Sequence, residues 1–184
     1  MSHLRIELVG PHEPETLPRG PLWDLLVVVD HEFVPSLSSR ESTTTRALAE
    51  NGGGAGPVTY YGAVCRQWGL WAHDDGGAAG MMSFIPHHSD EALGAFCPAT
   101  YLSTLAVLPA YRRAGTARKM YARLIEHSAQ IGDVTVATRT WSTNRGHLSL
   151  LGELGFVLTA RIPDHRGPGV DTVYLARPGV PPRR

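Results

Sequence analysis

A basic loop joins a strand pattern to a helix pattern in the stretch Leu105-Ala-Val-Leu-Pro-Ala-Tyr-Arg-Arg-Ala-Gly-Thr-Ala117. The apolar run Tyr101–Leu108 predicts a strand, and Pro109 ends it because proline lacks the N–H that a strand ladder needs. Beyond the loop, apolar residues from Ala117 to Ser128 recur at the spacing of one helix face. Backbone N–H groups at the start of a helix have no intrahelical partner and lie at the positive end of its dipole. The sequence therefore predicts an anion site, which Gly115 leaves open to phosphate oxygens because glycine has no Cβ.

The rest of the chain predicts further strands and helices on both sides of this stretch. On the N-terminal side, alternation, helical apolar spacing and Gly-containing turns predict a strand, three helices and a β-hairpin, at Leu4–Val9, Leu22–Phe33, Ser42–Glu50, Pro57–Gln67 and Leu70–Ile85. On the C-terminal side, the same signals predict a strand, a helix and two last strands, at Val134–Trp141, Asn144–Leu154, Phe156–Ile162 and Thr172–Ala176. We therefore expect an α/β mixture of about seven strands and about four helices, in which the hairpin and the last strands are antiparallel.

Composition limits the class of protein. Of the 184 residues, 42% are apolar and 18% are charged, which favours one globular domain that spans residues 1–184. The formal net charge is zero, so we expect neither a nucleic-acid partner nor an anionic membrane. Cys65 and Cys97 lie far apart in the sequence and are expected to be reduced core residues. No signal peptide or long apolar run is found, so a cytoplasmic protein is expected. A bound metal is not expected.

Two motifs at fixed spacing resemble the acyl-CoA-binding signature of the GNAT superfamily of N-acetyltransferases. The first is Arg112-x-x-Gly115-x-Ala117, preceded by Leu105-Ala-Val107-x-Pro109. The second is Asn144 at the start of a helix that ends in Gly155-Phe156. The resemblance covers roughly the last two thirds of the chain, and the first third fits only the loose order of family elements. It implies a GNAT fold with a mixed, mostly antiparallel sheet, in which a splayed strand pair holds the cofactor within a core at about residues 100–156.

The resemblance implies a role for individual residues. Backbone groups of Leu105 and Val107, in the segment that includes Ala106, would pair with the pantetheine amides of acetyl-CoA or another acyl-CoA. The pyrophosphate would lie against Arg112, Arg113, Ala114, Gly115, Thr116 and Ala117. Asn144 would hydrogen-bond the pantetheine arm or nearby backbone, although an Asn at this position is also an ordinary helix N-cap.

The chain departs from the family pattern at two catalytic positions. Many members carry a Tyr seven residues after the Asn as a general acid, and here that position is Leu151. We expect Leu151 to be a core residue, because it is in register with Leu148 and Leu154 on the same helix. Some relatives that acetylate proteins carry a Glu at the start of the strand before the loop, and here that position is Tyr101.

Four side chains are therefore candidates for the general base that takes the proton of the acceptor. They are His87, His88, Tyr101 and His147. We predict Tyr101 together with one of the His87/His88 pair. Arg139, Trp141 and Arg166 lie where the family often borders its acceptor site, so an acceptor that carries a carboxylate is one option.

The resulting hypothesis is an acyltransferase that moves an acetyl group from acetyl-CoA to a primary amine of a small molecule or peptide by direct attack. Two alternatives stay open. One is a biosynthetic acyltransferase whose acyl donor or acceptor is bound to the phosphopantetheine of an acyl carrier protein. The other is a catalytically silent module that binds CoA. Dimers are common in the family, so the resemblance also allows a homodimer.

Overall fold

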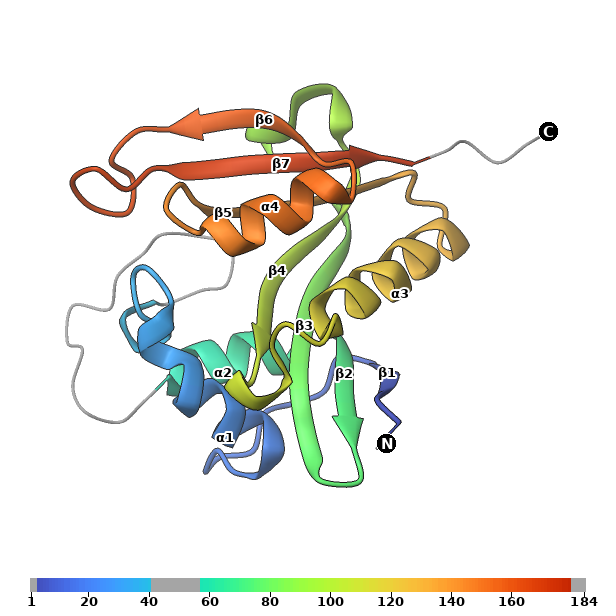
Figure 1. Ribbon diagram of the computed structural model, residues 1–184, viewed down its shortest axis with the longest axis vertical. Helices are drawn as coiled ribbons and strands as arrows, with labels where there is room; N and C mark the ends of the chain where they lie inside the picture. Colours follow the sequence, from blue (N-terminus) through green and yellow to red (C-terminus); the bar gives the residue numbers. More distant parts are fainter. Residues whose placement is uncertain (1–2, 41–56, 180–184) are drawn as a thin grey trace. The chain divides into compact units, whose positions relative to one another are not determined.

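The computed structural model describes residues 3–40 and 57–179. The helix expected at Ser42–Glu50 lies outside the described residues. Seven strands form a mixed sheet in the order β1-β2-β3-β4-β5-β7-β6, and four α-helices are found in the described part of the chain (Figure 1). This confirms the predicted fold class. The chain divides into two compact units, Met1–Phe84 with Ser103–Met120, and Ile85–Leu102 with Tyr121–Arg184. The prediction of a single domain stays a prediction.

The first unit contains the antiparallel strands β1 (Arg5–Val9) and β2 (Trp68–Asp74) and most of β3 (Gly77–His88). Its helices are α1 (Gly20–Val29) and α2 (Val58–Cys65). The predicted helix Leu22–Phe33 thus ends four residues early, and a 3-10 turn follows at Asp30–Glu32. Both helices bury one apolar face in a shared core that includes Leu25, Leu26, Tyr60, Val64, Met81 and Ala106. The helical interpretation of Pro57–Gln67 is confirmed.

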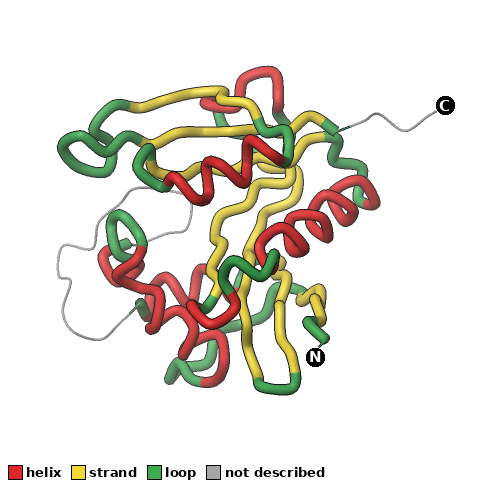
Figure 2. Tube along the Cα trace, in the orientation of Figure 1, coloured by secondary structure: helices red, strands yellow, loops and turns green. Residues whose placement is uncertain are grey.

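The second unit contains the start of β4 (Ala99–Val107) and the strands β5 (Thr135–Trp141), β6 (Val157–Ile162) and β7 (Thr172–Pro178). Strand β4 pairs with β5 in parallel, whereas β5 and β6 both pair with β7 in antiparallel fashion. Figure 2 shows the strands in yellow and the helices in red. Helix α4 (Arg145–Glu153) lies in the same unit.

Helix α3 (Thr116–Gln130) has residues in both units and buries Met120, Tyr121 and Leu124, as its apolar spacing predicts. No helix of the described residues has the length and apolar character needed to cross a membrane.

Candidate functional site

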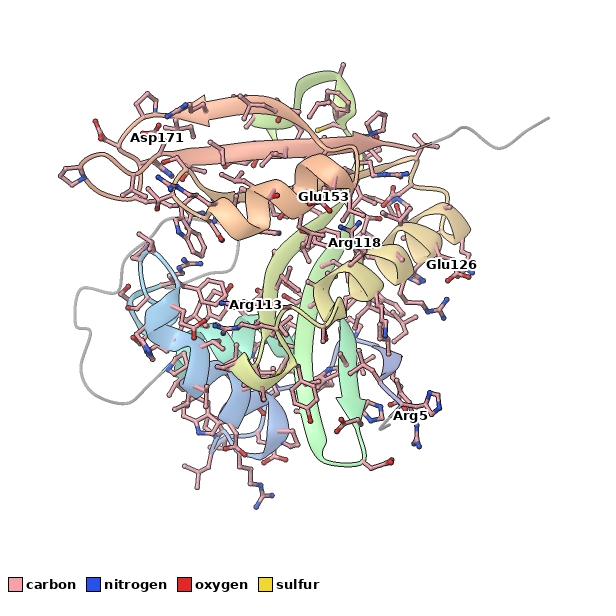
Figure 3. The ribbon with its side chains drawn as sticks, in the orientation of Figure 1. Arg5, Arg113, Arg118, Glu126, Glu153 and Asp171 are labelled. Atoms are coloured by element: carbon pink, nitrogen blue, oxygen red, sulfur yellow. The ribbon has the colours of Figure 1, made fainter. Side chains whose placement is uncertain are left out.

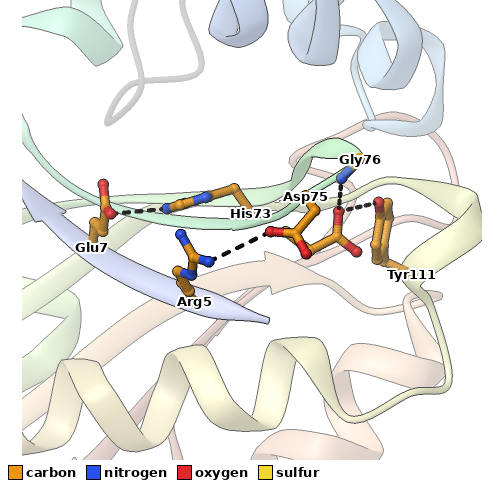
Figure 4. A network of polar contacts seen from close by, with 7 residues as sticks. Arg5, Glu7, His73, Asp75, Gly76 and Tyr111 are labelled. Carbon is orange, nitrogen blue, oxygen red and sulfur yellow. Dashed lines mark hydrogen bonds and ion pairs between the residues drawn. The ribbon is translucent and has the colours of Figure 1, made fainter. Parts of the chain in front are cut away.

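The predicted anion loop lies between the end of β4 and the start of α3. A single 3-10 turn at Pro109–Tyr111 follows the strand, and α3 begins at Thr116. Tyr111 ties this turn to the β2–β3 hairpin, because its hydroxyl donates to Asp74 Oδ1 at 2.9 Å (Figure 4). Thr116 Oγ1 donates to the carbonyl of Tyr111 at 2.9 Å and so fixes the start of the helix against the turn. The loop is thus held at both ends by hydrogen bonds within one unit.

Gly115 has the geometry that close approach to a ligand requires. Its φ is +80°, in the left-handed region that disfavours side chains, and a Cβ built on it would meet no atom within 4 Å. Arg113 also has a positive φ of 60°. The Gly115 carbonyl accepts the N–H of Lys119, which is the first hydrogen bond of the helix. The N–H groups of the first helical turn therefore follow directly after Gly115. Gly115 therefore leaves open space beside unpaired helical donors.

The two arginines of the loop differ in their surroundings. Arg112 donates from Nε to the carbonyl of Val107 at 2.8 Å and forms an ion pair with Glu32 at 2.5 Å. It fastens the loop to the end of β4 and to the segment after α1. Arg113, labelled in Figure 3, is exposed and has no side-chain partner among the described residues. Of the two guanidinium groups, that of Arg113 is therefore the one available to contact a ligand.

The segment predicted to bind pantetheine amides lies at the end of β4. Ala106 is buried, and Leu105 and Val107 are half-buried. The strand passes close to β3 here, since a Cβ built on Gly80 would lie 2.8 Å from the carbonyl oxygen of Ala106. The carbonyl oxygen of Val107 already accepts the side-chain Nε–H of Arg112. This oxygen has one further lone pair. The predicted pairing with pantetheine stays a prediction.

Asn144 is the N-cap of α4. Its Oδ1 accepts the N–H of His147 at 3.4 Å, and its Nδ2 donates to Thr140 Oγ1 at 3.1 Å. The N-cap interpretation is therefore confirmed, and a contact with the pantetheine arm stays a prediction. Leu151 on the same helix is fully buried, which confirms that it is a core residue.

His87 is bound to a buried carboxylate that the sequence did not indicate. Its Nδ1 contacts Asp133 Oδ1 at 2.7 Å, and its backbone N–H donates to Asp133 Oδ2 at 3.0 Å. Thr100 Oγ1 donates to the same carboxylate at 2.7 Å. The side chain of Asp133 is only 2% exposed, so these donors stabilise a charge that burial would otherwise disfavour. The arrangement holds His87 in place at the end of β3, and its part as a base stays a prediction.

His88 and Tyr101 lie together, with their ring centroids 4.6 Å apart. Burial lowers the pKa of His88. The charge of Asp90 raises this pKa and the charge of Arg139 lowers it, and burial is the largest of the three effects. Burial raises the pKa of Tyr101, and the charges of Arg139 and Arg166 oppose that rise only in part. At neutral pH the imidazole is therefore a neutral acceptor, while the phenol keeps its proton. This opposes the prediction of Tyr101 as the base and favours His88.

His147, the remaining candidate, lies in the first turn of α4. Its Nε2 contacts the hydroxyl of Tyr121 at 2.7 Å, and burial lowers its pKa to about 4. It is packed against the helix core, with its ring beside that of Tyr121.

One face of β4, β5 and β7 carries Tyr101 and Tyr174, which belong to a core cluster with Leu93 and three alanines. Tyr101 is in register with Ala137 on β5, and Ala137 is in register with Ala176 on β7. Two residues further along β5, Arg139 is in register with Tyr174, and Arg139 Nη1 donates to the Tyr174 hydroxyl at 3.5 Å. Sequence reasoning did not single out Tyr174. Strand alternation could have placed it on the face of Arg139 once the register was known.

Comparisons with known proteins agree with this geometry. The model of the acetyltransferase (GNAT) family matches residues 47–156, which is more than half of the chain. No curated protein matches. An acetyltransferase of Bacillus subtilis, solved in complex with CoA, is 16% identical over 97% of this chain and all of that chain, with a TM-score of 0.60.

Two further solved structures show the same fold. The IAA acetyltransferase of Bacillus cereus is 14% identical over 96% of this chain and 99% of that chain, with a TM-score of 0.61. The protein yncA of Salmonella typhimurium, solved with its cofactor acetyl-CoA, is 22% identical over 64% of this chain and 68% of that chain, with a TM-score of 0.52. From the family match, the sheet order and the loop at the start of α3, we conclude that the chain belongs to the GNAT acetyltransferase family.

Proposed function

We propose that the protein transfers an acetyl group from acetyl-CoA to a primary amine of a small molecule or peptide. The observation that carries this proposal is the loop at Gly115, where a left-handed glycine leaves open space beside the first turn of a 15-residue helix. A pyrophosphate placed there gains several backbone donors together. Solved neighbours that hold acetyl-CoA or CoA support the choice of donor.

The loop fits the phosphates of CoA in shape and in charge. The N–H groups of the first turn of α3 supply donors, and Arg113 supplies an exposed positive charge. Arg112, bound to Val107 and Glu32, keeps the loop in place. Bound acetyl-CoA supplies the acetyl thioester.

We assign the proton transfer to His88. A primary amine has a pKa of about 10, so it is protonated at neutral pH and must lose a proton for its nitrogen to attack. The nitrogen forms a bond to the acetyl carbonyl carbon, the C–S bond breaks, and the proton of the amine passes to a base. A neutral imidazole suits this role, and burial keeps His88 neutral down to lower pH than an ordinary histidine. The thiolate needs no strong acid, because its conjugate acid has a pKa of about 8.5 in the cysteine reference, and this is consistent with Leu151 in place of a Tyr.

The test is an acetyl-transfer assay on purified protein. Release of free thiol from acetyl-CoA would be followed with a panel of primary amines, and each product would be identified by its mass. The proposal predicts thiol release that depends on the amine and a product heavier by one acetyl group. Binding of acetyl-CoA without transfer to any amine would support the silent module instead. Turnover only with a pantetheinylated carrier protein would support the carrier-protein alternative.

A further inference from the structure

Tyr111 is the residue at which three parts of the first unit meet. Its backbone N–H donates to the carbonyl of Leu108, just after β4, at 2.9 Å. Its carbonyl accepts from Thr116 Oγ1 at the start of α3, and its hydroxyl donates to Asp74 Oδ1 at the end of β2. Each polar group of this one residue is therefore bound to a different segment. The turn at Pro109–Tyr111 is fixed relative to a strand, a helix and a hairpin together.

The carboxylate that accepts the Tyr111 hydroxyl also shapes the hairpin turn. Asp74 Oδ1 accepts the backbone N–H of Gly76 at 2.8 Å, and Asp74 is in register with Gly77 at the start of β3 (Figure 4). A Cβ built on Gly76 would lie 3.1 Å from this oxygen and 3.4 Å from the Tyr111 hydroxyl, so glycine allows the two groups to meet closely. The Tyr111 side chain is thus bound to a carboxylate whose own position the hairpin backbone fixes.

The loop beyond Tyr111 depends on such anchors because part of its backbone is strained. Arg113 has a φ of +60° and Gly115 a φ of +80°, and the side chains of residues 112–115 are exposed. A left-handed conformation at a residue other than glycine persists only where the surrounding structure holds it. The contacts of Arg112 are one such support, and those of Tyr111 are a second.

The conformation of this loop decides how well the proposed donor site is formed, since the N–H groups offered to the phosphates follow Gly115. If only a fraction of the molecules holds the loop in the binding conformation, the apparent Kd rises as the inverse of that fraction. We propose that Tyr111 is a positioning residue for the acyl donor, whose hydrogen bond to Asp74 keeps residues 112–115 in the conformation that receives the phosphates of acetyl-CoA. The inference rests on the proposed acetyl transfer. The β2–β3 turn thereby acts on the affinity for the donor.

The experiment compares Tyr111→Phe, which removes only the hydroxyl, with wild type. Calorimetry gives the Kd of acetyl-CoA, and steady-state acetyl transfer gives KM and kcat. Kd and KM should rise about threefold to tenfold, because a lost hydrogen bond to a charged group has an effect of about tenfold and the other anchors remain. The value of kcat should stay within about twofold, since the change affects binding and not the reaction of bound acetyl-CoA. A lower melting temperature with an unchanged Kd would show a merely structural bond and would overturn the proposal.

Asp74 and its neighbour Asp75 provide matched variants. Asp74→Ala should raise the Kd as Tyr111→Phe does, and the double variant should bind no more weakly than Asp74→Ala, because both changes remove the same bond. Asp74→Asn keeps an oxygen acceptor and should restore part of the affinity. Asp75→Ala removes the same charge from the same turn, but the Asp75 carboxylate contacts Arg5, so this variant should bind acetyl-CoA like wild type. Equal losses in Asp74→Ala and Asp75→Ala would assign the effect to charge, and the proposal would be wrong.

Failure of this inference can be told apart from failure of the proposed function. If wild type binds acetyl-CoA and acetylates an amine, while Tyr111→Phe has the same Kd, only the role of Tyr111 is wrong. If wild type neither binds acetyl-CoA nor acetylates any amine, the proposed function is wrong and the inference falls with it.

Discussion

The loop at the start of α3 and the sheet face of β4, β5 and β7 are built in different ways. The loop is mostly local: its anchors Val107, Tyr111 and Thr116 lie within ten residues of one another, while Asp74 and Glu32 come from elsewhere. The sheet face collects Tyr101, Arg139, Arg166 and Tyr174 from three strands and a loop. A loop whose anchors are close in sequence has a recognisable sequence pattern. A face assembled from several strands depends on strand register instead. In this protein the loop could therefore be recognised from the sequence, whereas the arrangement of the sheet face could not.

This comparison predicts that damage to the core of the second unit lowers stability but spares the loop. Leu151 is fully buried on α4, so Leu151→Ala should lower the free energy of unfolding by about 2–5 kcal/mol. The affinity of the folded protein for acetyl-CoA should stay within about threefold, because the loop is held by its own hydrogen bonds. Chemical denaturation and calorimetry at low temperature measure the two quantities. A large loss of affinity with intact folding would show that the loop depends on α4.

A second prediction concerns pH and the same unit. Burial lowers the pKa of His147 to about 4, while an exposed histidine in the unfolded chain titrates near 6.5. Protonation therefore favours the unfolded chain, so this contribution is complete above pH 6.5 and is lost as the pH falls toward 4. The loss should be about 3 kcal/mol. Urea unfolding of wild type and His147→Gln across this range measures it, and a difference between them that did not change with pH would contradict the assignment.

The third prediction separates the two adjacent histidines. His88→Ala should lower kcat/KM about 10²-fold, the usual effect of losing a general base. His87→Ala is the matched control and should stay within about threefold, because the ring of His87 is held by Asp133. In wild type, kcat/KM should begin to decrease only when the pH drops below the ordinary titration range of histidine, because the pKa of His88 is lowered. Equal losses in both variants would remove His88 from the mechanism.

The smallest effect is expected at Arg113. Its side chain is exposed, so its contribution to phosphate binding is screened by salt. Arg113→Ala should weaken acetyl-CoA binding by less than about tenfold at low salt, and the difference from wild type should shrink at high salt. Arg118 lies in the first turn of α3, and Arg118→Ala tests whether the effect belongs to the loop or to the general charge of α3. A salt-independent loss at Arg113 would indicate a geometric role.

The sequence predicted the fold well because its signals are local. The strand before Pro109, the helix after Gly115 and the hairpin were each confirmed within a few residues. The sequence could not show that Asp133 holds His87, that burial keeps Tyr101 protonated, or that Arg139 is in register with Tyr174. Each of these depends on contacts between different elements of the fold. Local pattern carries no information about such contacts, so the sequence left the choice between His87, His88 and Tyr101 open.

The most direct test of the account measures how acetyl-CoA stabilises the protein. At about a hundredfold excess over its Kd, acetyl-CoA should raise the free energy of unfolding of wild type by about 2.7 kcal/mol. Gly115→Trp should abolish this gain by filling the open space at the helix start. Gly132→Trp is the control, because Gly132 also has a left-handed φ, of +85°, and open space beside it, so the strain of about 1–2 kcal/mol is shared. The account predicts that only Gly115→Trp loses the stabilisation. Equal stabilisation of wild type and both variants would show that the loop does not bind the phosphates, and the donor assignment would be wrong.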